Sequence, residues 1–212
     1  LKKRLDRYHG LQLIALGTED AAAVEKAWMA TGEGVRPLAP LGRDVPQVGG
    51  GTKYGSFSIV YLENEAFPEA ELFAIQHHSV PVLWQPPLLD HPNGAQGLVG
   101  LDLVTPDLAR TKERLTRFGV VPESRDGIAV AGLSDGGEIT LLTPDQARAR
   151  YSGVALPPVP CVAAMRIAVD DLARTADYFS TTGVTFKAVQ NALRIRPQDA
   201  CGVVVDFVEG SE

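Results

Sequence analysis

The sequence is poor in cysteine and has no long apolar run. Its two cysteines, Cys161 and Cys201, cannot form a disulfide framework and lack metal-site spacing, so we expect both to be reduced, in a cytoplasmic protein. No segment approaches the roughly 18 consecutive apolar residues that a membrane span needs. The first ten residues are charged throughout, unlike a signal peptide. The sequence therefore predicts no membrane association.

Positive charge is also scarce. The chain has 20 Lys and Arg against 26 Asp and Glu, a formal net charge of −6. Nucleic-acid-binding proteins usually carry a clustered basic face, so we expect no nucleic-acid partner. The P-loop, G-x-G-x-x-G, H-E-x-x-H and G-x-S-x-G patterns are absent from the sequence, which gives no support to the corresponding nucleotide, metalloprotease or hydrolase sites.

What the sequence does contain is an internal repeat. Asp107-Leu108-Ala109-Arg110-Thr111 recurs as Asp171-Leu172-Ala173-Arg174-Thr175 at an offset of 64 (171 − 107 = 64), and Gly119-Val120 recurs as Gly183-Val184 at the same offset (183 − 119 = 64). A third copy lies upstream, where Asp20 and Gly32 match Asp107 and Gly119 at one offset (107 − 20 = 87, 119 − 32 = 87). Three copies of one structural unit follow from these matches.

Each copy has the same physical pattern. An apolar strand precedes an acidic residue suited to a helix N-terminus, helical spacing of apolar residues follows, and a glycine ends the helix. Three more strands complete the copy. The expected strands are 11–16, 35–41, 54–62 and 71–77 in the first copy, 98–104, a short piece near 121, 127–133 and 138–143 in the second, and 162–169, 185–189, 192–196 and 202–208 in the third. The unit is therefore a βαβββ module.

The predicted fold class is α+β. A sheet with one helix on one face leaves its other face apolar, so modules should pair into curved mixed sheets that enclose a cup, with the helices outside. Three modules leave one without an obvious mate. The predicted organisation is a linker at 1–9, modules at 10–80, 97–150 and 161–212, a connecting segment at 81–96 and a linker at 151–160.

The order strand, Asp-Asp-Leu-Ala, helix, Gly-Val resembles the vicinal oxygen chelate superfamily, which includes glyoxalase I, extradiol dioxygenases, and bleomycin and fosfomycin resistance proteins. The run from Gln76-His77-His78 through Trp84-Gln85-Pro86 to His91-Pro92-Asn93-Gly94 resembles the bridge of a glyoxalase-like family of bacterial proteins. Such proteins usually carry one more N-terminal unit, and Leu1–Tyr8 resembles the linker after it. We therefore expect the parent protein to exceed 22.7 kDa.

The resemblance implies one divalent metal, Zn, Ni, Mn or Fe, held by ligands from the first and last strands of two paired modules. Its first-strand positions fall at Leu13, Gly100 and Ala164, which cannot bind metal. Gln12 takes this position if Glu19 rather than Asp20 begins the first helix. The last-strand positions fall near Gln76 and His77, at Leu142 and at Asp206. The predicted metal ligands are thus Gln12, His77 and Asp206, with no bound metal as the alternative.

The predicted small-molecule contacts are Gln76, His77, Trp84 and His91. Each has a structural alternative: a strand-end His77 that caps a loop, a Trp84 packed between prolines, and a His91 that bonds its own turn. Period-two alternation sends His78 to the opposite face, where it is exposed. The structural alternatives for the third module are Asp206 paired with Arg166 or Arg194, and Cys161 and Cys201 packed in the core.

Three functions remain open. The resemblance implies a metal-dependent lyase, isomerase or dioxygenase, or a non-catalytic protein that binds or sequesters a small molecule. The third is a scaffold for dimerisation, and the second and third modules, which lack metal ligands at most family positions, are expected to pair as a scaffold. The expected partners are a small-molecule ligand and a second copy in a homodimer; nothing in the sequence selects the substrate.

Overall fold

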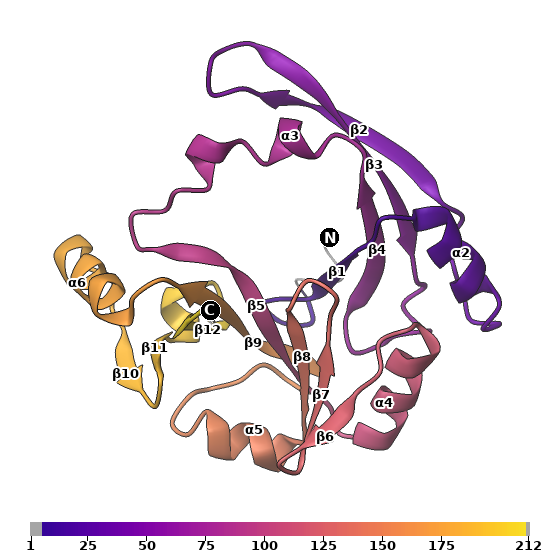
Figure 1. The fold of residues 1–212 in the computed structure, drawn as a ribbon. Coiled ribbons are helices and arrows are strands. Elements are labelled where there is room, and N and C mark those ends of the chain that lie inside the picture. Colours follow the sequence, from indigo (N-terminus) through magenta and orange to yellow (C-terminus); the bar gives the residue numbers. More distant parts are fainter. Residues whose placement is uncertain (1–5, 211–212) are drawn as a thin grey trace. The chain divides into compact units, whose positions relative to one another are not determined.

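The computed structural model describes residues 6–210, which form two compact units (Figure 1). Unit 1 contains the described residues up to Gln12 and those from His91 onward, and unit 2 is Leu13–Asp90. Among the described residues, no helix is long and apolar enough to cross a membrane. Each unit is built around its own mixed β-sheet, which confirms the α+β class.

Unit 2 is one βαβββ module followed by a connecting segment. Its elements are β1 (Leu13–Gly17), α2 (Ala21–Met29), β2 (Ala39–Pro46), β3 (Thr52–Tyr61), β4 (Glu71–His77), α3 (Val80–Leu83) and the 3-10 turn η1 (Pro86–Leu88). The strand order is β1-β4-β3-β2, with β1 parallel to β4 and the other pairs antiparallel. The parallel pair places the first and last strands of the module side by side, and β1 lies at the edge of this sheet.

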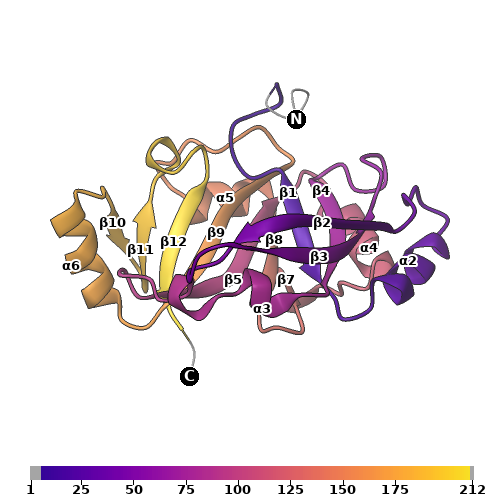
Figure 2. The same ribbon diagram turned by 90° about the horizontal axis from the view of Figure 1, so that it is seen from above.

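Unit 1 contains two more modules. The first comprises β5 (Ala95–Val104), α4 (Leu108–Arg117), β6 (Glu123–Arg125), β7 (Ile128–Gly132) and β8 (Glu138–Leu142), and is followed by α5 (Pro144–Arg150). The second comprises β9 (Cys161–Val169), α6 (Leu172–Thr182), β10 (Lys187–Val189), β11 (Ala192–Ile195), the 3-10 turn η2 (Pro197–Asp199) and β12 (Val204–Glu209). Their strands form one sheet in the order β10-β11-β12-β9-β5-β8-β7-β6. The two first strands, β5 and β9, pair antiparallel at its centre (Figure 2).

The helix boundaries follow from the chemistry of their ends. Asp20, Asp107 and Asp171 are the N-caps, and their carboxylates accept backbone N–H groups of the first turn at 2.9, 3.0 and 2.7 Å. A glycine in the left-handed region follows each helix, with φ values of 76°, 84° and 74° for Gly32, Gly119 and Gly183.

Two apolar clusters hold the sheet of unit 1, one on each face. On one face α6 packs against the strands through Phe179, whose ring makes an edge contact with Phe207 at 5.0 Å. On the other face α5 packs through Ala147, and Tyr151 and Tyr8 complete that cluster. The second cluster occupies part of the face on which a cup between paired modules was expected.

Several features differ from the sequence-based expectations, among them β2, which spans Ala39–Pro46 where a strand at 35–41 was expected. Helix α5 was not expected, although Thr143 and Gln146 form a reciprocal capping box with Pro144 between them. Cys161 is fully buried as expected, but Cys201 is exposed. Cys201 precedes β12 in a turn with φ of 52°, so it contributes nothing to the core.

Candidate functional site

His77 and Trp84 are in contact in unit 2. The imidazole of His77, at the end of β4, meets the indole of Trp84 edge-on at 4.9 Å, and the ring of Phe57 on β3 lies 6.2 Å away. Phe57 is the cross-strand partner of His77, so the two side chains share one face of the sheet. Trp84 follows α3 and is 48% exposed. The three rings form an aromatic cluster, and the indole of Trp84 is its half-exposed member.

This cluster lies on the sheet face opposite helix α2. Gln76, the neighbour of His77, points to the α2 side, because successive strand residues alternate between faces. Leu83 of α3 approaches Gly55 of β3 on the same face as Phe57. Figure 1 shows α2 and α3 on opposite sides of the sheet. We call the side with His77, Trp84 and Phe57 the open face of unit 2.

His77 is an uncharged imidazole at neutral pH. Burial lowers its pKa below the usual 6.5, and the nearby His78 lowers it further. Within residues 6–210, neither ring nitrogen of His77 has a hydrogen-bond partner. A neutral imidazole offers one N–H donor and one lone pair. His77 can therefore act as a hydrogen-bond partner, a proton acceptor or a single metal ligand.

Gln76 and His91 lie outside the aromatic cluster. The Gln76 side chain binds the start of α2: its Oε1 accepts from the Ala21 N–H at 3.1 Å, and its Nε2 donates to the Glu19 carbonyl. His91 belongs to unit 1, is exposed, and its carbonyl accepts the Gly94 N–H at 2.8 Å. Gln76 thus has a structural partner, and His91 lies in a turn. His78 is exposed and shares a 2.8 Å hydrogen bond with Ser58.

Within unit 1, the predicted metal ligands Gln12 and Asp206 are engaged by other groups. Because Asp20 is the N-cap of α2, the alternative register that would favour Gln12 is not the one adopted. Gln12 precedes β1, and its Nε2 donates to the Tyr8 carbonyl at 2.6 Å. Asp206 is buried and bound by both arms of Arg194, at 2.7 and 2.7 Å. Gln12 and Asp206 belong to unit 1, whereas His77 belongs to unit 2.

Within either unit, the described side chains therefore do not fit a divalent metal. Across residues 6–210, no group of three or more His, Cys, Asp and Glu side chains converges, whereas zinc and the related metals need three or four protein ligands. His77 could contribute one ligand on the open face.

Unit 1 holds a charge cluster on the face of its sheet that carries α5. Asp102 of β5 is fully buried and bonded to Arg166 of β9, to the Tyr151 hydroxyl at 2.6 Å and to Nε of Arg150 at 3.2 Å. Burial raises the pKa of Tyr151, and the adjacent Asp102 carboxylate raises it further, so its hydroxyl stays a donor. Arg194 lies over the Tyr151 ring at 4.6 Å. These contacts link α5 to the seam between the two modules, which is the antiparallel pair of β5 and β9.

Asp102 and Tyr151 were not expected as site residues, and Arg166 was expected only as a partner for Asp206. The repeat offset contains the missing signal, because Asp102 and Arg166 are equivalent positions of the two modules (166 − 102 = 64). In the antiparallel pairing of β5 with β9, Leu101 faces Met165 at this same offset, and Asp102 and Arg166 lie diagonally on either side of that pair. Opposite charges at such positions could have predicted an ion pair.

Gly100 explains why this face has room for the charge cluster. A Cβ on Gly100 would lie 2.2 Å from Nη2 of Arg166, so a side chain there would displace the guanidinium. Gly100 is one of the first-strand positions at which the family resemblance places a metal ligand. In this chain the Arg166 guanidinium occupies the space next to it.

A cleft of about 610 Å³ lies beside this cluster in unit 1. It is lined by Gln96, Gly97, Leu98, Val99, Asp135, Gly136, Glu138, Arg166, Ala168, Val208, Glu209 and Gly210. These residues come from β5 and β9, from β12 and the residue after it, and from the β7–β8 turn with the start of β8. Its volume is in the range of small-molecule sites, about 300–1,000 Å³.

Comparison with known proteins agrees with this architecture. Residues 1–119 match the family described as glyoxalase-like domain. Comparison with the curated proteins gives no match. Among solved structures, the fold is similar to a hypothetical protein from Staphylococcus aureus (TM-score 0.63, 12% identity, 94% of this chain and 66% of that one).

Two dioxygenase structures have the same fold. One is homoprotocatechuate 2,3-dioxygenase from Arthrobacter globiformis (TM-score 0.55, 15% identity, 94% of this chain and 61% of that one). The other is a single-residue variant of homoprotocatechuate 2,3-dioxygenase from B. fuscum (TM-score 0.53, 14% identity, 95% and 55%). At these identities the likeness concerns the fold. The chain spans less than two thirds of the length of all three.

Proposed function

Because the chain belongs to the family of proteins with a glyoxalase-like domain, we propose that it binds a small organic molecule on the open face of unit 2. His77 is the polar contact, and Trp84 is the aromatic surface against which the ligand packs. The observation that carries this proposal is the neutral His77 imidazole without a hydrogen-bond partner within residues 6–210, beside a half-exposed indole.

The aromatic cluster suits a flat or partly apolar ligand. Binding sites commonly combine aromatic walls with a few polar groups that fix orientation. Trp84 provides a π-face, and Phe57 supports the His77 ring from the strand beside it. The His77 lone pair would accept a hydroxyl proton of the ligand, and its N–H would donate to a carbonyl oxygen.

Fluorescence of the indole tests this proposal. Trp28 is buried in α2, so a Trp28→Phe chain retains Trp84 as its one tryptophan. Homoprotocatechuate is the first probe, because two proteins of similar fold carry its name. We expect saturable quenching that His77→Ala weakens at least tenfold. A series of aromatic and 2-hydroxy acids that never quenches saturably would contradict the proposal.

His78→Ala is the matched control. The two histidines are adjacent, but His78 is exposed and bonds Ser58 outside the aromatic cluster. We expect affinity within twofold of the unchanged chain. Equal losses from His77→Ala and His78→Ala would show that the effect does not come from the open face.

Binding should weaken in acid if the His77 lone pair is used. Protonation removes the lone pair, and the lowered pKa places this change below pH 6.5. The free energy of unfolding depends on pH in the same direction. Between the His77 pKa of the folded chain and 6.5, the unfolded chain binds more protons, so the free energy of unfolding falls as the pH drops through that interval. Urea titrations at several pH values should show a smaller loss for His77→Gln.

Metal-dependent catalysis is the second candidate, favoured by the free imidazole. His77 would supply one ligand, and the others would have to come from outside the described residues. Metal analysis of the purified protein tests this: stoichiometric Zn, Ni, Mn or Fe that is lost on His77→Ala supports an enzyme. Saturable probe binding without metal supports a binding protein.

We further propose that another βαβββ module covers the open face. In unit 1 the first strands β5 and β9 pair with each other; β1 is the equivalent strand of unit 2 and lies at a sheet edge. Of the twelve exposed large apolar side chains among the described residues, nine belong to unit 2, which suits a surface that acquires a partner. A second copy of this chain, in a homodimer, is the partner we propose.

A further inference from the structure

We propose that the cleft of unit 1 is a second binding site, specific for a small zwitterion. The ligand carboxylate would pair with Arg166, and its cationic end would face carboxylates at the rim. This site is separate from the open face of unit 2 and does not depend on the function proposed there.

The cation inside the cleft is held in position before any ligand arrives. Arg166 is 13% exposed, lines the cleft, and is bonded to Asp102 and, at 3.2 Å, to Thr140. Asp102 is itself fixed by Tyr151 and Arg150. Among the described residues the hydrogen-bond acceptors of Arg166 are Asp102 and Thr140, so other N–H groups of its five remain for a ligand. A fixed guanidinium suits a planar carboxylate.

Glycines keep the space beside this cation free of side chains. Gly100 lies under the guanidinium, where a Cβ would collide with it. Gly97 lines the same cleft, and no atom lies within 4 Å of the position that its Cβ would take. The cleft is therefore open on the Gly97 side and closed by the guanidinium on the Gly100 side.

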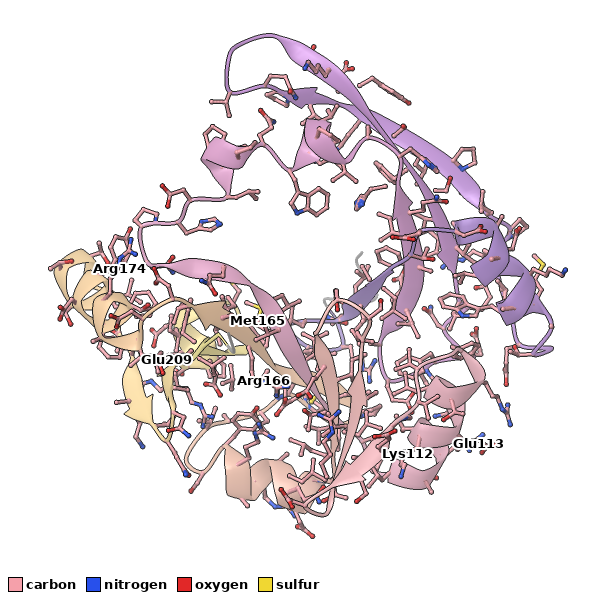
Figure 3. The ribbon with its side chains drawn as sticks, viewed as in Figure 1. Lys112, Glu113, Met165, Arg166, Arg174 and Glu209 are labelled. Atoms are coloured by element: carbon pink, nitrogen blue, oxygen red, sulfur yellow. The ribbon has the colours of Figure 1, made fainter. Side chains whose placement is uncertain are left out.

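The rim carries the opposite charge. Asp135, Glu138 and Glu209 line the cleft, and Glu138 is paired with Arg125 and lies 3.8 Å from Arg166. Asp135 and Glu209 are exposed residues with no salt bridge among the described residues. A half-buried cation with more exposed carboxylates around it disfavours a dianion and favours a molecule with one charge of each sign. Figure 3 shows Arg166 and Glu209 together on the sheet of unit 1.

Three probes of equal chain length separate the contributions. 6-Aminohexanoate carries both charges, hexanoate carries the carboxylate, and hexylamine carries the cation. Titrations followed by the NMR signals of the Gly97 and Gly210 amides should show that 6-aminohexanoate binds at least tenfold more tightly than either single-charge probe. Tighter binding of hexylamine or hexanoate, or no shift with 6-aminohexanoate at millimolar concentration, would overturn the proposal.

The variants avoid the buried ion pair, whose loss could unfold unit 1. Gly97→Val should fill the cleft and abolish binding, since its side chain enters open space. Glu209→Gln should weaken 6-aminohexanoate several-fold and leave hexanoate unchanged or tighter. Glu113→Gln is the matched control, because Glu113 lies on α4 outside the cleft (Figure 3). Unchanged binding by Gly97→Val, or equal effects of Glu209→Gln and Glu113→Gln, would refute the site.

Discussion

At the scale of single residues, the Arg194–Asp206 pair shows how a candidate ligand can serve the fold instead. The two residues face each other across β11 and β12, and both are buried. Asp206→Ala leaves the guanidinium uncompensated, so we expect a loss of about 3–5 kcal/mol in the free energy of unfolding. Urea denaturation of this variant and of Arg194→Met/Asp206→Leu measures it. The double variant should recover most of the loss, and Asp199→Ala, in an exposed pair with Arg196, should cost less than about 1 kcal/mol. Equal stability of Asp206→Ala and Asp199→Ala would contradict this account.

At the scale of elements, helix α5 depends on its first residues. Its seven residues are too few to be stable alone, so the Thr143–Gln146 capping box and the packing of Tyr151 hold it. Thr143→Ala should lower the free energy of unfolding by about 0.5–2 kcal/mol. Thr116→Ala, which removes an exposed hydroxyl of α4 bonded to the Lys112 carbonyl, should change it by less than about 0.5 kcal/mol. A Thr143→Ala chain as stable as Thr116→Ala would mean that the cap does not determine α5.

At the scale of the whole molecule, the repeat predicts the modules but not the side-chain contacts within them. Asp107, Asp171 and their glycines predicted helix ends because capping is local chemistry. The Asp102–Arg166 pair depends on the antiparallel pairing of β5 with β9, which makes these two residues diagonal neighbours although they are 64 positions apart in the sequence (166 − 102 = 64). Local patterns do not contain such a contact. The structural roles of Gln76 and Asp206 likewise depend on partners that the fold brings to them.

The proposed homodimer is a prediction at this same scale. Light scattering should give a mass near 2 × 22.7 kDa that falls toward 22.7 kDa in Leu13→Lys, which places a charge on the exposed β1 edge strand. Val121→Lys, at an exposed apolar residue of unit 1, should leave the mass unchanged. A monomeric chain at all concentrations would contradict the homodimer.

The most direct measurement is an NMR titration of the His77 imidazole nitrogens, assigned by comparison with His77→Ala. We expect a neutral ring at pH 7 with one unprotonated nitrogen, a midpoint below 6.5, and a shift of that nitrogen's signal on adding a probe that quenches Trp84. A ring that is protonated at pH 7, or whose nitrogens do not respond to any quenching probe, would contradict the proposed site on the open face.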